Sequence, residues 1–299
     1  MSHVFLKMMK VFGLVFLCLL GNVGSVQAEK IKVVATFSIL ADMVKNVAHD
    51  NVEVFVLVGD NGDVHEYEPT PQDTVLLNSA QLIFENGLEL ENWLDKMYAA
   101  SGSLARRVVV SNGIKVRSMP EDSHEIDPHA WQDIGNGIIY TRNIARALKE
   151  IDPFHAEEYE KNAAQYIALL KDMDTWGREE LSIIKNRAIV TNHDALGYFA
   201  DHYDLKVVGA VIPSATTEAS DPSAKQMAQL IKVIKANHVR TIFAENVGNV
   251  RLAHNLAEQT GVMLVPSIYT DALGDKDSSG STYVDMMRSN ITIFKESLK

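Results

Sequence analysis

The sequence predicts an α/β protein with two lobes, each a mostly parallel four-stranded sheet with flanking helices, joined by one long rigid helix. Short apolar runs rich in β-branched residues alternate with helical patterns in both halves of the chain. Continuous apolar runs are typical of parallel strands that are buried on both faces. Between the halves lies a segment of about 30 residues with helical spacing and no internal proline, which predicts the joining helix.

The amino terminus has the order of a secretory signal peptide, which we assign to residues 1–28. Lys7 and Lys10 precede an apolar run, Val11 to Leu20, which is too short to span a bilayer as a helix. Val26-Gln27-Ala28 then supplies the small residues that a signal peptidase requires. We expect cleavage after Ala28.

A lipoprotein is the alternative, and Cys18 would then carry the lipid. Val15-Phe16-Leu17 lacks the small residue normally found just ahead of a lipidated cysteine. We therefore expect a periplasmic product, secreted through a cleaved signal peptide, that is soluble rather than lipid-anchored.

The charge balance is acidic. The chain has 28 Lys and Arg against 39 Asp and Glu, and removal of residues 1–28 takes away two lysines, which leaves 26 against 39. Nucleic acid is an unsuitable partner for such a surface. The net charge keeps a secreted protein soluble, and attraction of cations is a secondary benefit. No cysteine remains for a disulfide.

Four runs in each half are predicted strands. They are Ile31–Phe37, Val52–Val58, Gln81–Phe84 and Arg107–Val110 in the first half, and Ala188–Thr191, Lys206–Ile212, Thr241–Ala244 and Met263–Pro266 in the second. We therefore place an N-terminal α/β lobe at 29–150 and a C-terminal α/β lobe at 186–299. The mature chain is long enough for two cores of ordinary size.

The linking long helix is predicted at 151–185. Pro153 suits the first helical turn, where its missing N–H is no loss, and apolar residues recur at three- or four-residue spacing from Tyr159 to Trp176. Because a continuous helix is stiff, we expect the lobes to move little relative to each other. The alternative is that this helix is one more packing element within a lobe.

Nine of the ten histidines follow the signal peptide. His155, His202, His238 and His254 lie in helical stretches of mixed polarity, which is typical of solvated or capping side chains. His65, His129 and His193 instead follow strands or lie in turn-rich loops, each with a carboxylate nearby. These three are candidate metal ligands, although no pair has the i, i+4 spacing of a zincin helix.

The loops around the three candidates have features of binding loops. The His65 loop, Gly59–Pro71, follows a predicted strand, and Thr70 can cap the next helix. Loops at the carboxyl ends of parallel strands are where open α/β sheets bind ligands. Trp131, two residues after His129, can exclude water, and His193 lies between a strand and a helix.

Four loop regions resemble the signature segments of the zinc/manganese substrate-binding proteins of ABC transporters, the cluster A-I (cluster 9) type. The segments are His65–Pro71, Asp127–Trp131, Asn192–Phe199, and Tyr269–Gly274 followed by Thr282–Met287. They occur in the family's order across essentially the whole mature chain.

The resemblance implies a metal bound between two lobes, by His65 and His129 from the first lobe and by His193 and Asp271 from the second. It also implies that one Mn²⁺ or Zn²⁺ is transported cargo, delivered for uptake to an ABC transporter permease with its ATPase. No other cofactor and no catalytic residue is implied, and we expect a monomer.

The choice of metal follows from the donors and from two departures from the family pattern. Three imidazoles favour Zn²⁺, which also precedes Mn²⁺ in the general affinity order. Members usually carry proline where this chain has Val64, so a looser loop is expected there. The linker Met119–Ile126 lacks the long His-rich loop of dedicated zinc members. Together with Asp271, this absence favours manganese as the physiological cargo, with zinc able to bind.

Acidic residues near the candidate ligands are candidates for supporting roles. Asp63, Glu66, Asp127 and Asp194 could hold imidazole N–H groups or offset the metal charge. Each is equally well explained as a turn or helix-start acid. Glu245, at the end of a predicted strand, is the best further candidate.

Two other function classes are less well supported. A metallohydrolase keeps a coordination position open for water, and no G-x-S-x-G, Walker or H-E-x-x-H motif occurs in the chain, so we expect no enzyme activity. The alternative is a binding protein for a metal chelate such as a siderophore or haem. The loops between the lobes carry histidines and acids with few arginines, which disfavours that cargo.

Overall fold

The computed structural model describes residues 30–119, 124–217 and 221–299. The predicted signal peptide, its cleavage position and Cys18 lie outside this part of the chain. Residues Ile31–Lys299 form one unit, and within the described residues no helix combines the length and apolar character needed to cross a membrane.

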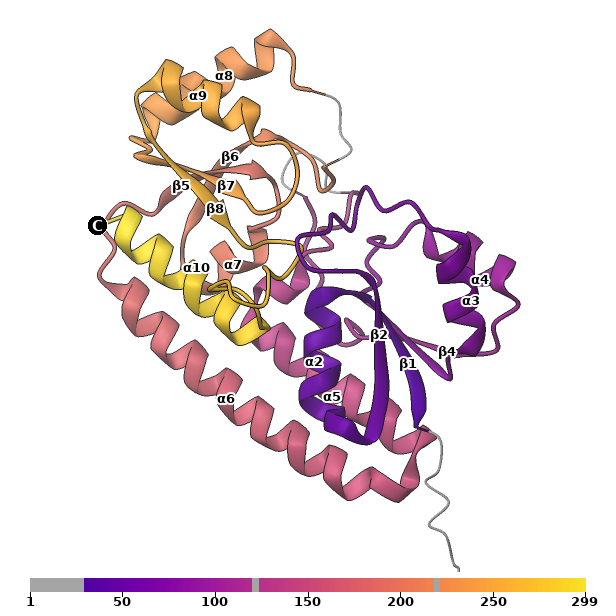
Figure 1. The fold of residues 1–299 in the computed structure, drawn as a ribbon. Coiled ribbons are helices and arrows are strands. Elements are labelled where there is room, and N and C mark those ends of the chain that lie inside the picture. Colours follow the sequence, from indigo (N-terminus) through magenta and orange to yellow (C-terminus); the bar gives the residue numbers. More distant parts are fainter. Residues whose placement is uncertain (1–29, 120–123, 218–220) are drawn as a thin grey trace, which may run out of the picture. The chain divides into compact units, whose positions relative to one another are not determined.

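The first sheet has four parallel strands in the order β2-β1-β3-β4 (Figure 1). They are β1 (Ile31–Phe37), β2 (Val52–Val58), β3 (Leu82–Glu85) and β4 (Arg106–Val109). Alternate side chains of β1 enter different apolar clusters, because Val33 faces α2 (Ser38–Ala48) and α5 (Ile134–Ile151), while Val34 faces α3 (Pro71–Ser79) and α4 (Leu94–Ser101). Burial on both faces explains the uninterrupted apolar runs in the sequence.

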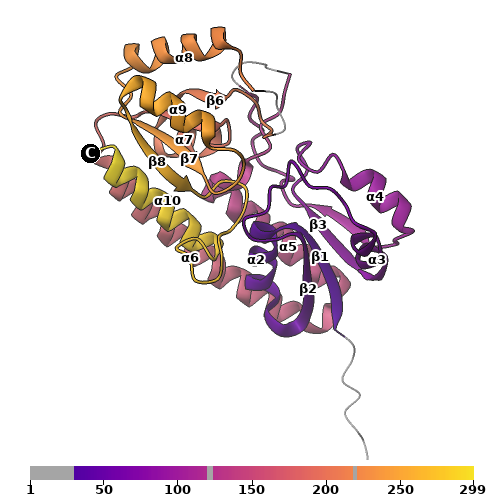
Figure 2. The same ribbon diagram turned by 45° about the horizontal axis from the view of Figure 1, so that its top comes forward.

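The second sheet repeats this arrangement, with four parallel strands in the order β6-β5-β7-β8. They are β5 (Ala188–His193), β6 (Lys206–Ile212), β7 (Thr241–Glu245) and β8 (Met263–Ile268). Figure 2 shows α8 (Ala224–Ala236) and α9 (Arg251–Thr260) on one face, with α7 (Gly197–Tyr203) and α10 (Tyr283–Ser297) on the other. The predicted fold class, with two such lobes joined by a long helix, is confirmed.

Some strand ends differ from the predicted ones for identifiable reasons. Strand β5 continues to His193, which pairs with Ile212 of β6. Strand β8 runs past Pro266 because it is an edge strand, where a residue without an N–H is tolerated. Both strands are therefore longer at their carboxyl ends than the apolar pattern predicts, and they reach closer to the candidate site residues.

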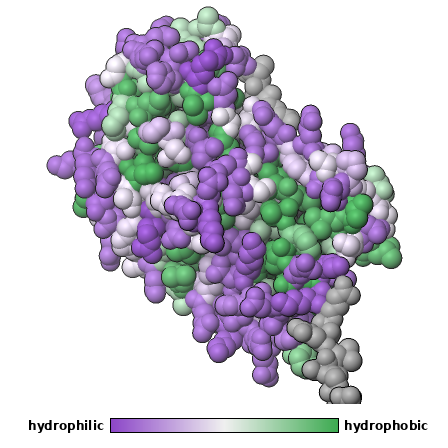
Figure 3. All heavy atoms as spheres, viewed as in Figure 1, coloured by the Kyte–Doolittle hydropathy of each residue, from purple (hydrophilic) through white to green (hydrophobic). Residues whose placement is uncertain are grey.

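The long helix α6 (Ala156–Ser182) packs against both lobes. It follows a 3-10 turn, Pro153–His155, and contacts α2 and α5 of the first lobe and α7 and α10 of the second. Its buried residues recur at helical spacing from Tyr159 to Leu181 and include Gly177, where an added Cβ would lie 2.7 Å from Ile291 Cδ1. One apolar cluster runs from β1 through α6 to α10. Hydrophilic residues cover most of the face viewed in Figure 3. The division of the chain at residues 150 and 186 stays a prediction.

His202 has a role that the sequence did not indicate. Its Nδ1 lies 2.7 Å from Asp133, the residue that caps the start of α5, and its Nε2 lies 2.6 Å from Asp174 of α6. Burial lowers the pKa of His202, but hydrogen bonds to the two carboxylates outweigh burial and raise it to about 9. The protonated ring therefore links helices that belong to different lobes, instead of the solvated or capping role expected for it.

Replacing His202 with Gln should reveal a pH-dependent contribution to stability. Because the folded pKa is above the unfolded value of about 6.5, the contribution is complete below pH 6.5 and is lost as the pH rises through about 9. Allowing for solvent screening, we expect the unfolding free energy difference between parent and variant to shrink by about 1–2 kcal/mol from pH 6 to pH 10. Urea titrations of the metal-free proteins measure it, and a pH-independent difference would contradict the assignment.

Candidate metal centre

Four side chains from four separate segments of the chain converge at the carboxyl ends of the two sheets. His65 follows β2, His129 precedes a 3-10 turn (Ala130–Gln132), His193 ends β5, and Asp271 follows β8. One ligand atom of each lies within 4.8 Å of the others. These are the four residues that the family resemblance implied, and the fold brings them together with two from each lobe.

The separations between these atoms suit a tetrahedral metal ion. His129 Nε2 lies 3.3 Å from both His65 Nε2 and His193 Nε2. Asp271 Oδ2 lies 3.2 Å from His193 Nε2 and 3.5 Å from His65 Nε2, and Asp271 Oδ1 lies 3.6 Å from His129 Nε2. Ligands bonded at about 2.1 Å to a tetrahedral ion are about 3.4 Å apart, so the four groups are spaced to hold one such ion.

A carboxylate lies on the outer side of two of the rings, beside Nδ1, so Nε2 is the nitrogen that faces inward. His129 Nδ1 lies 2.9 Å from Asp127 Oδ1, and His193 Nδ1 lies 2.5 Å from Glu245 Oε2. A carboxylate beside Nδ1 favours the tautomer that carries its proton there, which leaves Nε2 as the nitrogen that can bind a metal. Both carboxylate oxygens of Asp271 are buried and have no hydrogen-bond partner among the described residues. Lone pairs and an unpaired carboxylate therefore meet where only a cation can satisfy them.

The pKa values of His193 and Asp271 are shifted in opposite directions by the charges around them. Burial works to lower the pKa of His193, but the charges of Glu245 and Asp271 outweigh burial and raise the pKa well above its usual value. Burial works to raise the pKa of Asp271, but His193 and His129 outweigh burial and hold the pKa well below its usual range. The metal-free site thus favours an imidazolium beside the carboxylate, and a metal must displace that proton.

The first lobe holds the backbone of the Asp271 loop. Trp131 Nε1 donates to the Thr270 carbonyl at 2.7 Å, and Gln132 Nε2 donates to the same oxygen at 2.6 Å. Thr270 Oγ1 in turn donates to Glu245 Oε2 at 2.9 Å. Trp131 is fully buried, and its ring lies edge-on to His129 with centroids 5.4 Å apart. The indole thus positions one loop and covers one ligand ring.

Asp127 is itself held by Arg117, which the sequence gave no reason to select. Arg117 Nη1 donates to Asp127 Oδ2 at 2.8 Å. Burial lowers the pKa of Arg117, but Asp127 and Asp201 outweigh burial and raise it. Arg117 therefore offsets the negative charge of the buried Asp127 beside the site.

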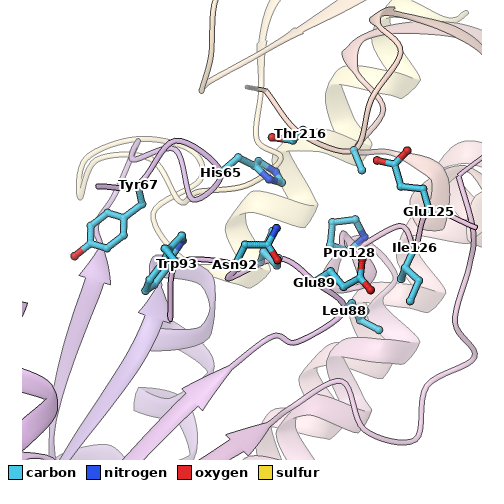
Figure 4. Close-up of a pocket in the computed structure, with 12 residues that line it drawn as sticks. His65, Tyr67, Leu88, Glu89, Asn92, Trp93, Glu125, Ile126, Pro128 and Thr216 are labelled. Carbon is cyan, nitrogen blue, oxygen red and sulfur yellow. The ribbon is translucent and has the colours of Figure 1, made fainter. Parts of the chain in front are cut away.

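Of the four candidate ligands, His65 is the least buried and adjoins a cavity of about 380 Å³. Figure 4 shows its ring at the edge of this space. The cavity is lined by His65, Tyr67, Leu88, Glu89, Leu90, Asn92, Trp93, Glu125, Ile126, Pro128, Ala215 and Thr216. Val64 is fully buried, and its carbonyl accepts a hydrogen bond from Trp93 Nε1 at 3.2 Å. The cavity gives solvent a route to the site from the His65 side.

The proposed supporting acids have different surroundings. Asp127 and Glu245 contact ligand imidazoles, and Asp63 Oδ1 accepts the backbone N–H of His65 at 2.9 Å. Asp194 is buried without a partner for its Oδ1 in the described structure, and burial raises its pKa. Glu66 is exposed to solvent. Nothing in the sequence pattern separates these cases, because all five acids lie in loops or at strand ends.

A family model described as "Zinc-uptake complex component A periplasmic" matches residues 33–297. The chain belongs to this family. It is 33% identical over 293 residues to the metal ABC transporter substrate-binding lipoprotein SsaB of Streptococcus sanguinis, covering 95% of this chain and 94% of the relative. It is also 33% identical over 276 residues to the iron-binding protein YfeA of Yersinia pestis, covering 91% and 87%.

Solved structures of family members share the fold. The Mn-bound periplasmic metal binding protein from Candidatus Liberibacter asiaticus matches with a TM-score of 0.82 at 29% identity, over 90% of this chain and all of that one. The periplasmic zinc binding protein TroA from Treponema pallidum matches with a TM-score of 0.83 at 29% identity, over 90% and 99%. The two-lobed architecture is therefore a property of the family.

The relatives correct one expectation. SsaB, the manganese ABC transporter substrate-binding lipoprotein PsaA of Streptococcus mitis and the manganese-binding lipoprotein MntA of Halalkalibacterium halodurans are named lipoproteins. The expectation of a product that is soluble rather than lipid-anchored was wrong. The expectation rested on the residue types just before Cys18. These residues affect only how well a processing enzyme recognises the site, whereas acylation itself requires a thiol, which Cys18 supplies.

Replacing Glu245 with Gln should weaken metal binding by about 10–100-fold, because the carboxylate orients His193 and offsets the metal charge. Calorimetric titration of the metal-free protein with Zn²⁺ measures this change. Glu66→Gln is the matched control, since it alters an exposed acid beside His65 and should leave the affinity unchanged. Equal affinities for the parent and Glu245→Gln would show that the contact plays no part in binding.

Proposed function

We propose that His65, His129, His193 and Asp271 are the ligands of a divalent transition metal that this chain captures between its lobes. The chain delivers the ion to the permease of an ABC transporter, whose ATPase drives uptake. The observation that carries this proposal is the buried, unpartnered carboxylate of Asp271 facing three imidazole nitrogens. The family to which the chain belongs supports it.

The donor set indicates which ions fit. Imidazole and carboxylate suit Zn²⁺, Mn²⁺, Fe²⁺ and Co²⁺, whereas Cu(I) prefers sulfur, and Mg²⁺ and Ca²⁺ prefer oxygen. Relatives and structural neighbours are named for manganese, iron and zinc. We propose Mn²⁺ as the physiological cargo and Zn²⁺ as an ion that binds the same ligands at least as tightly.

An enzymatic role does not fit this set of contacts. Four protein ligands leave no open position for a reactive water on a four-coordinate ion. Asp127 and Glu245, the acids in contact with ligand imidazoles, are held by those contacts and are not free to act as a general base. We therefore propose a monomeric carrier, without catalytic residues or nucleic-acid partner, whose lobes are 29–150 and 186–299 on either side of the 151–185 helix.

A chelate such as a siderophore or haem is a weaker candidate for the cargo. The cavity beside His65 is lined by Glu89 and Glu125, and no arginine or lysine is among its lining residues. Anionic chelates and haem propionates require cationic partners. A bare or hydrated cation is the better match for such a wall.

Titration of the chelator-stripped protein with Mn²⁺ and Zn²⁺ tests the ligand assignment. We expect one-to-one binding that is weakened by at least about 100-fold in His65→Ala and in Asp271→Ala, since each change removes a metal bond. Calorimetry of the three proteins in parallel provides the affinities. If both variants bind as the parent does, the four residues are not the ligands.

The affinity should depend on pH. Because the pKa of His193 is raised in the metal-free fold, a proton competes with the metal even near neutral pH. Each displaced proton lowers the affinity by up to about tenfold per pH unit of acidification. We expect a decrease of more than about tenfold between pH 7.5 and pH 5.5, and a flat profile would be inconsistent with imidazole ligands.

A further inference from the structure

Asn61 lies in the same first-lobe loop as His65, four residues before it. The backbone of Asn61 is left-handed, with φ of 54°, in a turn closed by a hydrogen bond from Gly62 N–H to the Gly59 carbonyl at 3.1 Å. Asparagine tolerates this conformation better than most residues. The turn directs both the N–H and the side chain of Asn61 toward the second lobe.

Three hydrogen bonds join Asn61 to the second lobe. Its backbone N–H donates to the Leu273 carbonyl at 2.8 Å. Its Nδ2 donates to Asp275 Oδ1 at 3.0 Å, and its Oδ1 accepts from Asn246 Nδ2 at 3.3 Å. Both polar atoms of the Asn61 side chain and its backbone N–H therefore form hydrogen bonds to the second lobe.

The partners of Asn61 belong to the segments that position the second-lobe ligands. Leu273 and Asp275 follow Asp271, and Asn246 follows Glu245, which contacts His193. Asn246 also bonds both sides of Asp271, because its Nδ2 donates to the Ala272 carbonyl at 3.2 Å and its Oδ1 accepts the Thr270 N–H at 3.3 Å. Asn61 is thus connected through Asn246 to the loop that carries Asp271.

The other first-lobe contacts with this loop are buried, whereas the side-chain bonds of Asn61 are exposed. In the interior, the Leu273 N–H donates to Ser38 Oγ. The Thr270 carbonyl accepts hydrogen bonds from Trp131 and Gln132. The Asn61 bonds to Asp275 and Asn246 lie at the surface, beside the ligand that adjoins the cavity. A second tie between the His65 loop and the second lobe is the part-buried bond from Thr217 Oγ1 to Asp63 Oδ2 at 2.8 Å. Withdrawal of the loop requires this bond and the Asn61 contacts to break, and the side-chain bonds of Asn61 are the ones most open to water.

We propose that Asn61 is a positioning residue that holds the His65 loop against the second lobe and thereby sets the rate at which the bound metal leaves. The inference rests on the proposed function and concerns the lifetime of the metal complex. Asn61 touches no ligand atom among the described contacts, so its effect is transmitted through loop position. A weaker attachment shortens the time during which His65 completes the coordination.

Exchange of the donor and acceptor between Asn61 and Asp275 provides the test. Asn61→Asp places two carboxylates opposite each other, whereas Asp275→Asn keeps an acceptor for the Asn61 amide. In the double variant Asn61→Asp/Asp275→Asn, the amide and the carboxylate change places and the bond is restored. Each full-length mature protein is loaded with Zn²⁺ and mixed with excess 4-(2-pyridylazo)resorcinol, whose absorbance reports released metal.

We expect Zn²⁺ release about tenfold faster in Asn61→Asp, which corresponds to the loss of roughly one hydrogen bond to a charged group. Asp275→Asn and the double variant should stay within about twofold of the parent. Asp60→Asn changes the neighbouring residue of the same turn, for which no bond to the second lobe is described, and serves as the control. Urea titrations of the metal-free proteins verify that every variant is fully folded under the conditions of the release experiment.

The outcomes separate this inference from the proposed function. A parent protein that takes up no Zn²⁺ contradicts the proposed function itself. Normal loading with equal release rates in the parent and Asn61→Asp overturns the role of Asn61 alone. A double variant that releases Zn²⁺ as fast as Asn61→Asp also overturns it, because the effect would then not depend on the bond.

Discussion

The structure depends on one buried carboxylate. Asp271 is fully buried, its carboxylate has no hydrogen-bond partner among the described residues, and it faces the Nε2 atoms of three histidines from three other segments of the chain. An unpaired buried charge costs several kcal/mol, so a positive charge must balance Asp271, either the protonated imidazole of His193 in the metal-free fold or a bound metal ion. Since two of the histidines belong to the other lobe, a metal ion bound by the proposed ligands would also join the lobes at this point.

The two sides of the junction between the lobes have different chemistry. On the α6 side, one continuous apolar cluster extends from β1 to α10, and sliding across it would expose apolar surface. On the site side, the junction consists of directed polar contacts, such as those of Trp131 with Thr270 and of Asn61 with Asn246. Such contacts break singly at about 1 kcal/mol each, so loop movement beside the site costs less than rotation of a lobe.

The sequence determined the fold more completely than the site. Because the strands are buried on both faces of each sheet, all eight could be predicted from apolar runs in the sequence. The predictions differed from the structure only at strand ends, such as His193 and Ile268. The family resemblance implied which four residues meet, whereas spacing alone gave three unconnected histidines. His202 and Arg117 were missed because their partners lie in other elements, and pattern analysis contains no information about such pairings. Asn61 was recognisable only as a turn residue.

The same contacts suggest why one site can serve more than one metal. Glu245 and Asp127 fix the rings of His193 and His129, so these two donors have little freedom. Both oxygens of Asp271 are free, and the carboxylate can give one bond or two. One bond completes the tetrahedron that Zn²⁺ prefers, and a second bond adds the oxygen donor that Mn²⁺ favours. We therefore expect the ligand set to accept both ions and the metal supply to decide which is carried.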